Sequence, residues 1–319
     1  MNLINITNFH KPSKFNILKM EDNLKTNFKK VMEFNRAFDM VSQEPNNYSC
    51  YEEDCNGNIK CNPFKNSRKD IFTLTPFIIK LRLSLIKEEL DELNVAIIEN
   101  DLIEQRDACA DILYVVYGMA DVLGIEIDDY FNIKLNQNLE HYISNININN
   151  NSIQKISNFN KIKNITDEIL GNNIYKTVAE LSQIIKDNLY KSYLELESNC
   201  YNENISDDAT KFELIANTIY DLLKWTYSMT IVIGTNADDD FSIVHESNMS
   251  KLCSTKEDAI KTVEDYQIKY VAGISPYDSP YFYYLPNINK WIVKNLSTGK
   301  ALKNIKYKKV SFVNPRFVF

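Results

Sequence analysis

The chain repeats part of itself. Residues 111–133 align without a gap with residues 221–243 at a constant spacing of 110, and a glycine, two adjacent aspartates and a phenylalanine fall at matching places. Upstream, residues 86–93 can be laid on residues 185–192. Self-similarity at a fixed spacing indicates two copies of one structural unit. We therefore expect the copies to pack on each other as an intrachain pseudo-dimer. A chance likeness of two amphipathic helices is the alternative.

Helical periodicity runs through both copies. Apolar residues recur three and four positions apart, and only 7 glycines and 8 prolines interrupt the sequence. This pattern is typical of amphipathic helices and predicts a mainly α fold. The main helices are expected at residues 22–41, 73–99, 102–123, 163–199 and 207–233.

The C-terminal part of the chain has a different composition. Aromatic and β-branched residues fill 280–286 and 290–294, and turn-forming residues follow at 297–300. This pattern predicts two or three short strands. We expect them to form a small C-terminal β appendage to the helical core.

These patterns divide the chain into regions. The first helical repeat is expected at residues 20–147, with a polar loop insertion at 44–70. An asparagine-rich linker follows at 148–164, then a degenerate second repeat at 165–253 and a C-terminal extension with short strands at 254–319.

Composition and charge exclude several classes of function. A net charge of −7 leaves no long basic surface for a nucleic-acid backbone. No apolar run approaches the roughly 20 residues that a membrane span needs, and no secretory signal is evident, so we expect a cytoplasmic protein. Cys50, Cys55 and Cys61 lack the paired spacing of a zinc knuckle, and a surface loop is expected there.

Acidic side chains form two stripes on neighbouring helices. Glu92 lies four residues after Glu88 and three residues after Glu89, so the three side chains project from adjacent positions on one helix face. On the next helix, Asp107 and Asp111 are four apart, with Glu104 as a third candidate. A short turn makes the two helices antiparallel neighbours whose stripes can face each other.

Facing carboxylates in a partly buried groove repel one another unless a cation lies between them. Oxygen-only ligands favour Mg²⁺, with Mn²⁺ as an alternative, over zinc. A solvated acidic helix face is the competing interpretation. However, Leu85, Leu90 and Leu93 form an apolar stripe that places the acids at its boundary, where a groove is expected.

The sequence also resembles a known group of enzymes. Residues 81–93 followed by 107–118 resemble the all-α nucleoside triphosphate pyrophosphohydrolases, the MazG-like and phosphoribosyl-ATP pyrophosphohydrolase-like proteins. Residues 34–38 are similar to the first helix of that group. Residues 244–252 and 298–303 are similar to the closing segment of one of its subgroups.

The resemblance implies a reaction and a set of metal ligands. A nucleoside triphosphate would be cut between its α and β phosphates, giving a monophosphate and pyrophosphate, in a role such as cleaning the nucleotide pool. Mg²⁺ would be held by carboxylates, and one glutamate, Glu88 or Glu89, would be the catalytic base. The implied metal ligands are Glu88, Glu89, Glu92, Asp107 and Asp111.

The second copy lacks most of this set. Asn188, Lys191 and Asn217 stand where the first copy has Glu89, Glu92 and Asp107, whereas Asp221 retains the carboxylate of Asp111. A lysine among the ligands opposes cation binding, so we expect this copy to be catalytically inactive.

The second copy is nevertheless expected to complete the site of the first. Asn248 and Lys251 lie three apart near a helix end, and the first copy has His141 in place of the lysine. Our hypothesis is that Lys251 binds phosphate as a point charge. Arg36, by family likeness, and Tyr114, which could stack on a base or simply belong to the core, are further candidate substrate-binding residues.

The expected partner is therefore a small-molecule nucleoside triphosphate, with no nucleic acid and no membrane. The base and sugar stay open: dUTP, dCTP and damaged nucleotides are all compatible. The chain is expected to be a monomeric pseudo-dimer or a homodimer. A non-catalytic nucleotide-binding, metal-binding or scaffolding protein and a different nucleotide phosphohydrolase are the alternatives.

Overall fold

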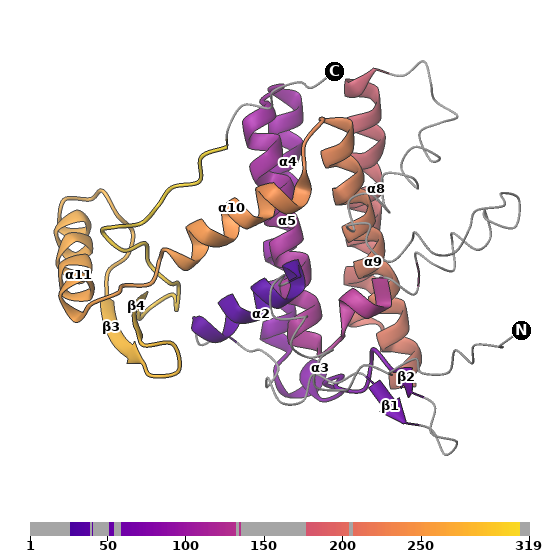
Figure 1. The fold of residues 1–319 in the computed structure, drawn as a ribbon, viewed down its shortest axis with the longest axis horizontal. Helices are drawn as coiled ribbons and strands as arrows, with labels where there is room; N and C mark the ends of the chain where they lie inside the picture. Colours follow the sequence, from indigo (N-terminus) through magenta and orange to yellow (C-terminus); the bar gives the residue numbers. More distant parts are fainter. Residues whose placement is uncertain are drawn as a thin grey trace, which may run out of the picture.

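The computed structural model describes residues 26–38, 40, 51–53, 59–131, 134, 177–203 and 207–312 (Figure 1). Its described helices are α2 (Asn27–Ala37), α3 (Ile71–Leu74), α4 (Pro76–Ile98), α5 (Leu102–Leu123), α8 (Val178–Tyr201), α9 (Asp208–Val232), α10 (Ala237–Met249) and α11 (Lys256–Val271). Its described strands are β1 (Tyr51–Glu53), β2 (Ile59–Cys61), β3 (Pro280–Leu285) and β4 (Lys290–Asn295). The mainly α fold with a small C-terminal sheet is confirmed.

The first helical hairpin, α4 and α5, turns sharply between its helices. Asn100 adopts a positive φ of 53°, and the Asp101 side chain accepts hydrogen bonds from the backbone N–H groups of Ile103 and Glu104. An aspartate cap of this kind satisfies donors that the first helical turn leaves free. At the other end, Gly124 terminates α5 with a φ of 75°. The expected helix at 102–123 is confirmed.

The second hairpin, α8 and α9, is capped in a similar way. Thr177 and Glu180 form a capping box at the start of α8, and Asp207 accepts from the first turn of α9. The helix expected at 163–199 therefore begins later among the described residues, at Val178, and residues 163–176 lie outside them.

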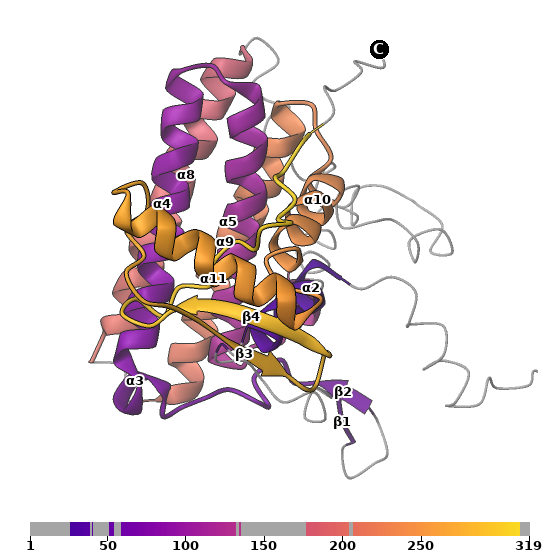
Figure 2. The same cartoon turned by 90° about the vertical axis from the view of Figure 1, so that its left-hand side faces the viewer.

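The two hairpins lie side by side as a bundle of long helices in both views (Figures 1 and 2). Ile86, Leu90 and Leu93 of α4 are fully buried, and so are Leu189 and Leu196 of α8. These side chains belong to one continuous apolar core. Each hairpin carries an apolar face formed by the stripes of its helices. Packing the two hairpins together removes both faces from water.

Contacts across the bundle are reciprocal. The hydroxyl groups of Tyr117 and Tyr227, which are 110 residues apart, lie 3.1 Å from each other. Phe131 packs on Tyr227 with ring centroids 6.3 Å apart, and Phe241 packs on Tyr117 at 6.2 Å. In a two-fold interface each contact occurs twice with the roles exchanged. The geometry agrees with a pseudo-dimer; a duplication as its origin stays a prediction.

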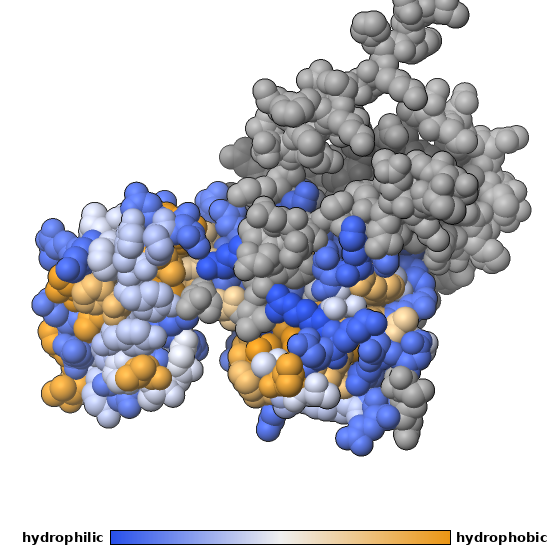
Figure 3. All heavy atoms as spheres, turned by 90° about the horizontal axis from the view of Figure 1, so that it is seen from below, coloured by the Kyte–Doolittle hydropathy of each residue, from blue (hydrophilic) through white to orange (hydrophobic). Residues whose placement is uncertain are grey.

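The C-terminal module (residues 252–302) packs α11 on the antiparallel pair β3 and β4. The strands were expected from the sequence, and α11 was not. Its buried side chains among residues 256–271 are only Asp258, Ala259 and Thr262, too few to give a visible apolar period. The module lies in front of the bundle in Figure 2. Its underside, at the left of Figure 3, mixes polar and apolar side chains.

The loop expected at residues 44–70 needs a correction. Strands β1 and β2 pair antiparallel within it, with Tyr51 opposite Cys61 and Glu53 opposite Ile59. Strands of three residues leave too short an alternation to read from sequence.

Several expectations fall outside the described residues: parts of the first helix, Cys50, Cys55, His141 and the linker at 148–164. None of the described helices combines the length and apolar character of a membrane span.

Candidate functional site

A cavity of about 370 Å³ lies where α2, α4, α5 and α10 meet the segment that follows the C-terminal module. Residues far apart in the sequence come together there. The polar and aromatic side chains that line it are Phe34, Asn35, Arg82, Glu89, Asp107, Asp111, Tyr114, Ser247, Asn248, Lys251, Lys303 and Tyr307.

Three of the expected carboxylates form the acidic wall of this cavity. Burial, and then the charge of Asp111 and other neighbouring acids, raises the pKa of Glu89 to about 8. Burial, followed by repulsion from Asp107, raises the pKa of Asp111 to about 7. The Oδ1 atom of Asp107 is buried and has no hydrogen-bond partner among the described residues. Mutually repelling acids with an unsatisfied oxygen are suited to a hard cation.

The other expected ligands face a different space. Glu88 and Glu92 line a second cavity of about 790 Å³ together with Glu104. Burial first, and then Glu88 and Glu104, raises the pKa of Glu92. As placed, no three acidic, histidine or cysteine side chains among the described residues are close enough to enclose a metal ion. The expected metal ligands are therefore supported by their chemistry, since all of them are carboxylates, and not by their present spacing.

A basic wall faces the acids. Lys251 donates from Nζ to Asn248 Oδ1 at 2.6 Å. Burial lowers the pKa of Lys251, whereas the nearby Asp111 raises it. Lys303 lines the same cavity from the C-terminal side. Sequence reasoning named Asn248 and Lys251 but gave no role to Lys303, although the family likeness of residues 298–303 pointed to that segment.

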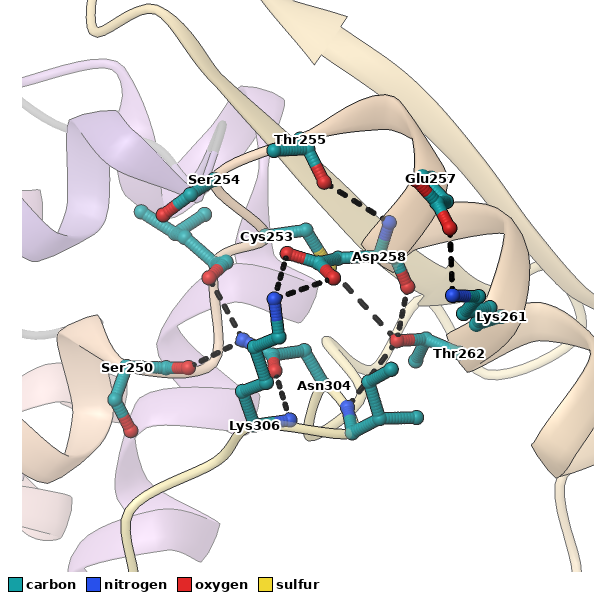
Figure 4. A network of polar contacts seen from close by, with 12 residues as sticks. Ser250, Cys253, Ser254, Thr255, Glu257, Asp258, Lys261, Thr262, Asn304 and Lys306 are labelled. Carbon is teal, nitrogen blue, oxygen red and sulfur yellow. Dashed lines mark hydrogen bonds and ion pairs between the residues drawn. The ribbon is translucent and has the colours of Figure 1, made fainter.

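The segment that carries Lys303 is fixed by polar contacts. We call residues 302–310 the C-terminal strap. Asn304 donates to the backbone carbonyls of Ser250 at 2.6 Å and Leu252 at 2.7 Å, and Lys306 pairs with Asp258 (Figure 4). The Asn304 contacts tie the strap to the residues just after α10, and the Lys306 ion pair ties it to α11.

Tyr307 lies farther along the strap. Its hydroxyl accepts a hydrogen bond from Ser247 on α10 at 2.8 Å. The strap is thereby held against the cavity at both Lys303 and Tyr307.

Tyr114 belongs mainly to the core. Its ring stacks on Phe241 with centroids 5.2 Å apart, and its hydroxyl lies 3.1 Å from His245 Nδ1. Phe34, which meets Tyr114 edge-on at 5.3 Å, is only half-buried and also lines the cavity. Arg36 lies on α2 and is not among the residues that line the cavity.

A polar floor closes the cavity beside α2. The Asn35 amide donates to Asp121 at 2.7 Å and accepts from Arg82 at 3.4 Å. Burial lowers the pKa of Arg82. Sequence reasoning missed this pair, because an arginine or asparagine in an amphipathic helix is ordinarily a surface residue.

The corresponding positions of the second hairpin are satisfied internally. Asp221 pairs with Lys224 at 2.6 Å, and Asn217 accepts a hydrogen bond from Tyr130 at 2.7 Å. Asn188 donates to the backbone carbonyl of Ile184. None of these three contacts requires a bound cation, and the inactivity of this copy stays a prediction.

Comparisons with known proteins identify a related domain and a relative of the whole chain. Residues 62–137, which include α4 and α5, match the family model of phosphoribosyl-ATP pyrophosphohydrolase. The chain is 32% identical over 293 residues to the uncharacterized protein L479 of Acanthamoeba polyphaga mimivirus, covering 90% of this chain and 94% of that protein. No solved structure matches the chain. The chain therefore belongs to the same family as the mimivirus protein, and carries at residues 62–137 a domain of the phosphoribosyl-ATP pyrophosphohydrolase type.

Proposed function

We propose that this protein is a Mg²⁺-dependent nucleoside triphosphate pyrophosphohydrolase, which releases a nucleoside monophosphate and pyrophosphate. One observation carries the proposal: a single cavity has three carboxylates, Glu89, Asp107 and Asp111, on one wall and Lys251 and Lys303 on the other. A triphosphate needs both, because its charge is met by lysines directly and by carboxylates through a cation.

Glu89, Asp107 and Asp111 would hold Mg²⁺, with Glu88 and Glu92 on the adjoining strip of α4 as further ligands. When bound, Mg²⁺ neutralises phosphate charge and lowers the pKa of the attacking water. The donor set fits this ion because every member is a carboxylate, and the buried Asp107 Oδ1 has no hydrogen-bond partner among the described residues.

The protein's own residues would then position the substrate and move a proton. Lys251, oriented by its hydrogen bond to Asn248, would bind a phosphate oxygen. Glu89 would accept the proton of the water that attacks the α phosphorus, because it lines the cavity whereas Glu88 faces the outer one. The bond from the α phosphorus to its bridging oxygen breaks, and pyrophosphate leaves.

The test uses matched positions in the two hairpins. The full chain is assayed with Mg²⁺ and a panel of nucleoside triphosphates, and both products are identified. Asp111→Asn is expected to lower kcat/KM by roughly a hundredfold or more, comparable to the loss of one preorganised charged group. Asp221→Asn, its counterpart in the second hairpin, is expected to retain activity.

A second variant tests whether both hairpins contribute to one site. Lys251→Ala is expected to raise KM roughly tenfold or more, because a charge-assisted hydrogen bond to phosphate is lost. Unchanged turnover and substrate affinity in this variant would contradict the composite site. Release of orthophosphate instead of pyrophosphate, or no product with any nucleotide, would contradict the proposed activity.

A further inference from the structure

Arg82 is a buried cation at the end of the cavity away from the carboxylates. Its side chain is only 5% exposed, yet it lines the cavity. Arg82 and Glu89 share one face of α4, because residues seven apart return to the same side of a helix. The helical rise separates them by about 10 Å along the axis. A ligand held at the carboxylates by its phosphates would therefore reach Arg82 with its far end.

The guanidinium has donors to spare. Among the described residues it makes one hydrogen bond, from Nη2 to Asn35 Oδ1. One N–H of the Asn35 amide is committed to Asp121 at 2.7 Å. A guanidinium carries five N–H donors and no acceptor. Arg82 therefore offers the cavity donors alone.

The neighbouring helix leaves room for this side chain. Gly118 of α5 lies beside Arg82, and a Cβ atom at Gly118 would lie 2.5 Å from Arg82 Nη1. Any larger residue at position 118 would push the guanidinium aside. The glycine thus explains how a full-length arginine fits between α4 and α5, and it supplies a second way to displace the group.

The walls near Arg82 suit a nucleobase. Phe34 and Met40 line the same cavity as Arg82, and the Lys251 ammonium lies 5.9 Å from the centroid of the Phe34 ring. An aromatic ring offers a stacking surface, and it contributes little to phosphate binding.

We propose, building on the proposed function, that Arg82 donates a hydrogen bond to the carbonyl oxygen at position 4 of a pyrimidine or position 6 of a purine. In a pyrimidine this position lies across the ring from the sugar, so it points away from the phosphates. Uracil and hypoxanthine carry an acceptor there, whereas cytosine and adenine carry an amino group, which is a donor. The site therefore selects oxo-bases over amino-bases.

The experiment compares substrates that differ mainly at this position. The full chain is assayed with dUTP against dCTP and with dITP against dATP. Wild type is expected to favour the oxo-base of each pair by roughly ten- to a hundredfold in kcat/KM, the range of a hydrogen bond to a charged group. Arg82→Lys retains the charge but loses the fork of donors, and is expected to abolish most of the preference.

Two further variants separate recognition from folding. Gly118→Ala leaves Arg82 in place but displaces its guanidinium, and the same loss of preference is expected. Arg68→Lys changes an arginine that does not line the cavity, and the preference should remain. A wild type without preference, or a preference that survives in both Arg82→Lys and Gly118→Ala, would overturn the proposal.

Binding without turnover makes the two proposals distinguishable. Calorimetry with dUMP and dCMP needs no catalysis, so it reports on Arg82 even if no nucleotide is hydrolysed and the proposed function fails. Tighter binding of dUMP than of dCMP, lost in Arg82→Lys, would support base selection by itself. Equal binding of the two, or no binding of either, would overturn it.

Discussion

Glu126 lies in the turn after α5, where its side chain is mostly buried beside Asp128. Burial first, and then the charges of Asp128 and Asp129, raises the pKa of Glu126 from 4.5 to about 8. Thr26 donates a hydrogen bond to Asp128. The folded protein therefore holds a proton on Glu126 at pH values where the unfolded chain has lost it.

The sign of the resulting pH dependence follows from this difference. The stability linked to Glu126 is fully present below pH 4.5 and is lost as the pH rises to about 8. Glu126→Gln cannot titrate, so the variant should gain stability relative to wild type at pH 8 but not at pH 5. Urea unfolding of both proteins at the two pH values measures the difference. An equal difference at both pH values would show that Glu126 keeps its ordinary pKa.

Some positions of the site carboxylates could be predicted from the sequence, and others could not. Spacing alone placed Glu89, Asp107 and Asp111 on facing helices, because helical geometry is fixed by residue number. The assignment of Glu88 and Glu92 to another cavity depends on how α4 is rotated against α5. That rotation is set by tertiary packing, and no local pattern encodes it.

At the scale of elements, α5 is the helix whose two ends the sequence predicted most closely. The limits of α5 follow from Asp101 at one end and Gly124 at the other, both of which are readable in the sequence. The helix α11 was missed because its buried face is narrow and partly polar, with Asp258 and Thr262 among its few buried side chains. Capping residues thus predicted the limits of α5 well, whereas a weak apolar periodicity failed to predict α11.

The two helix-ending glycines provide a matched test. Gly124 and Gly234 have φ values of 75° and 74°, so alanine is strained at both. At Gly124 a Cβ would also lie 2.1 Å from the backbone oxygen of Asn66, whereas Gly234 has nothing within 4 Å. Gly234→Ala should lose about 1–2 kcal/mol of stability. Gly124→Ala should lose about 3 kcal/mol or more, since backbone must move as well.

Thermal or urea unfolding of wild type and the two glycine variants measures both losses of stability. Equal losses would mean that the loop at Asn66 is free to move away from the end of α5.

At the scale of the whole molecule, a buried ion pair joins two segments that are distant in the sequence. Arg106 of α5 donates to both carboxylate oxygens of Asp240 on α10, at 3.0 and 2.6 Å. Both side chains are under a tenth exposed, and the Arg106 guanidinium lies over the Phe312 ring at 4.6 Å. Because Arg106 adjoins Asp107, this pair also fixes the helix that carries the acidic wall.

Removal of one partner of the Arg106–Asp240 ion pair should lower the stability of the fold strongly. Asp240→Ala leaves a buried guanidinium without its counterion, and it should destabilise the fold by about 3–5 kcal/mol. Replacing both partners with apolar residues, Arg106→Met and Asp240→Leu, should restore most of the loss. Urea unfolding of the single and double variants tests this. A double variant no more stable than Asp240→Ala would mean that the pair itself supplies the stability.

The hydroxyl contact between Tyr117 and Tyr227 joins two hairpins that belong to one chain. In a dimer of identical subunits every substitution appears twice, so a single change alters both copies of a site together. Within one chain each hairpin mutates by itself. The second can acquire a pair such as Asp221 with Lys224 while the first retains its acids. Under the proposed function, natural selection can therefore act on chemistry in one hairpin and on stability in the other.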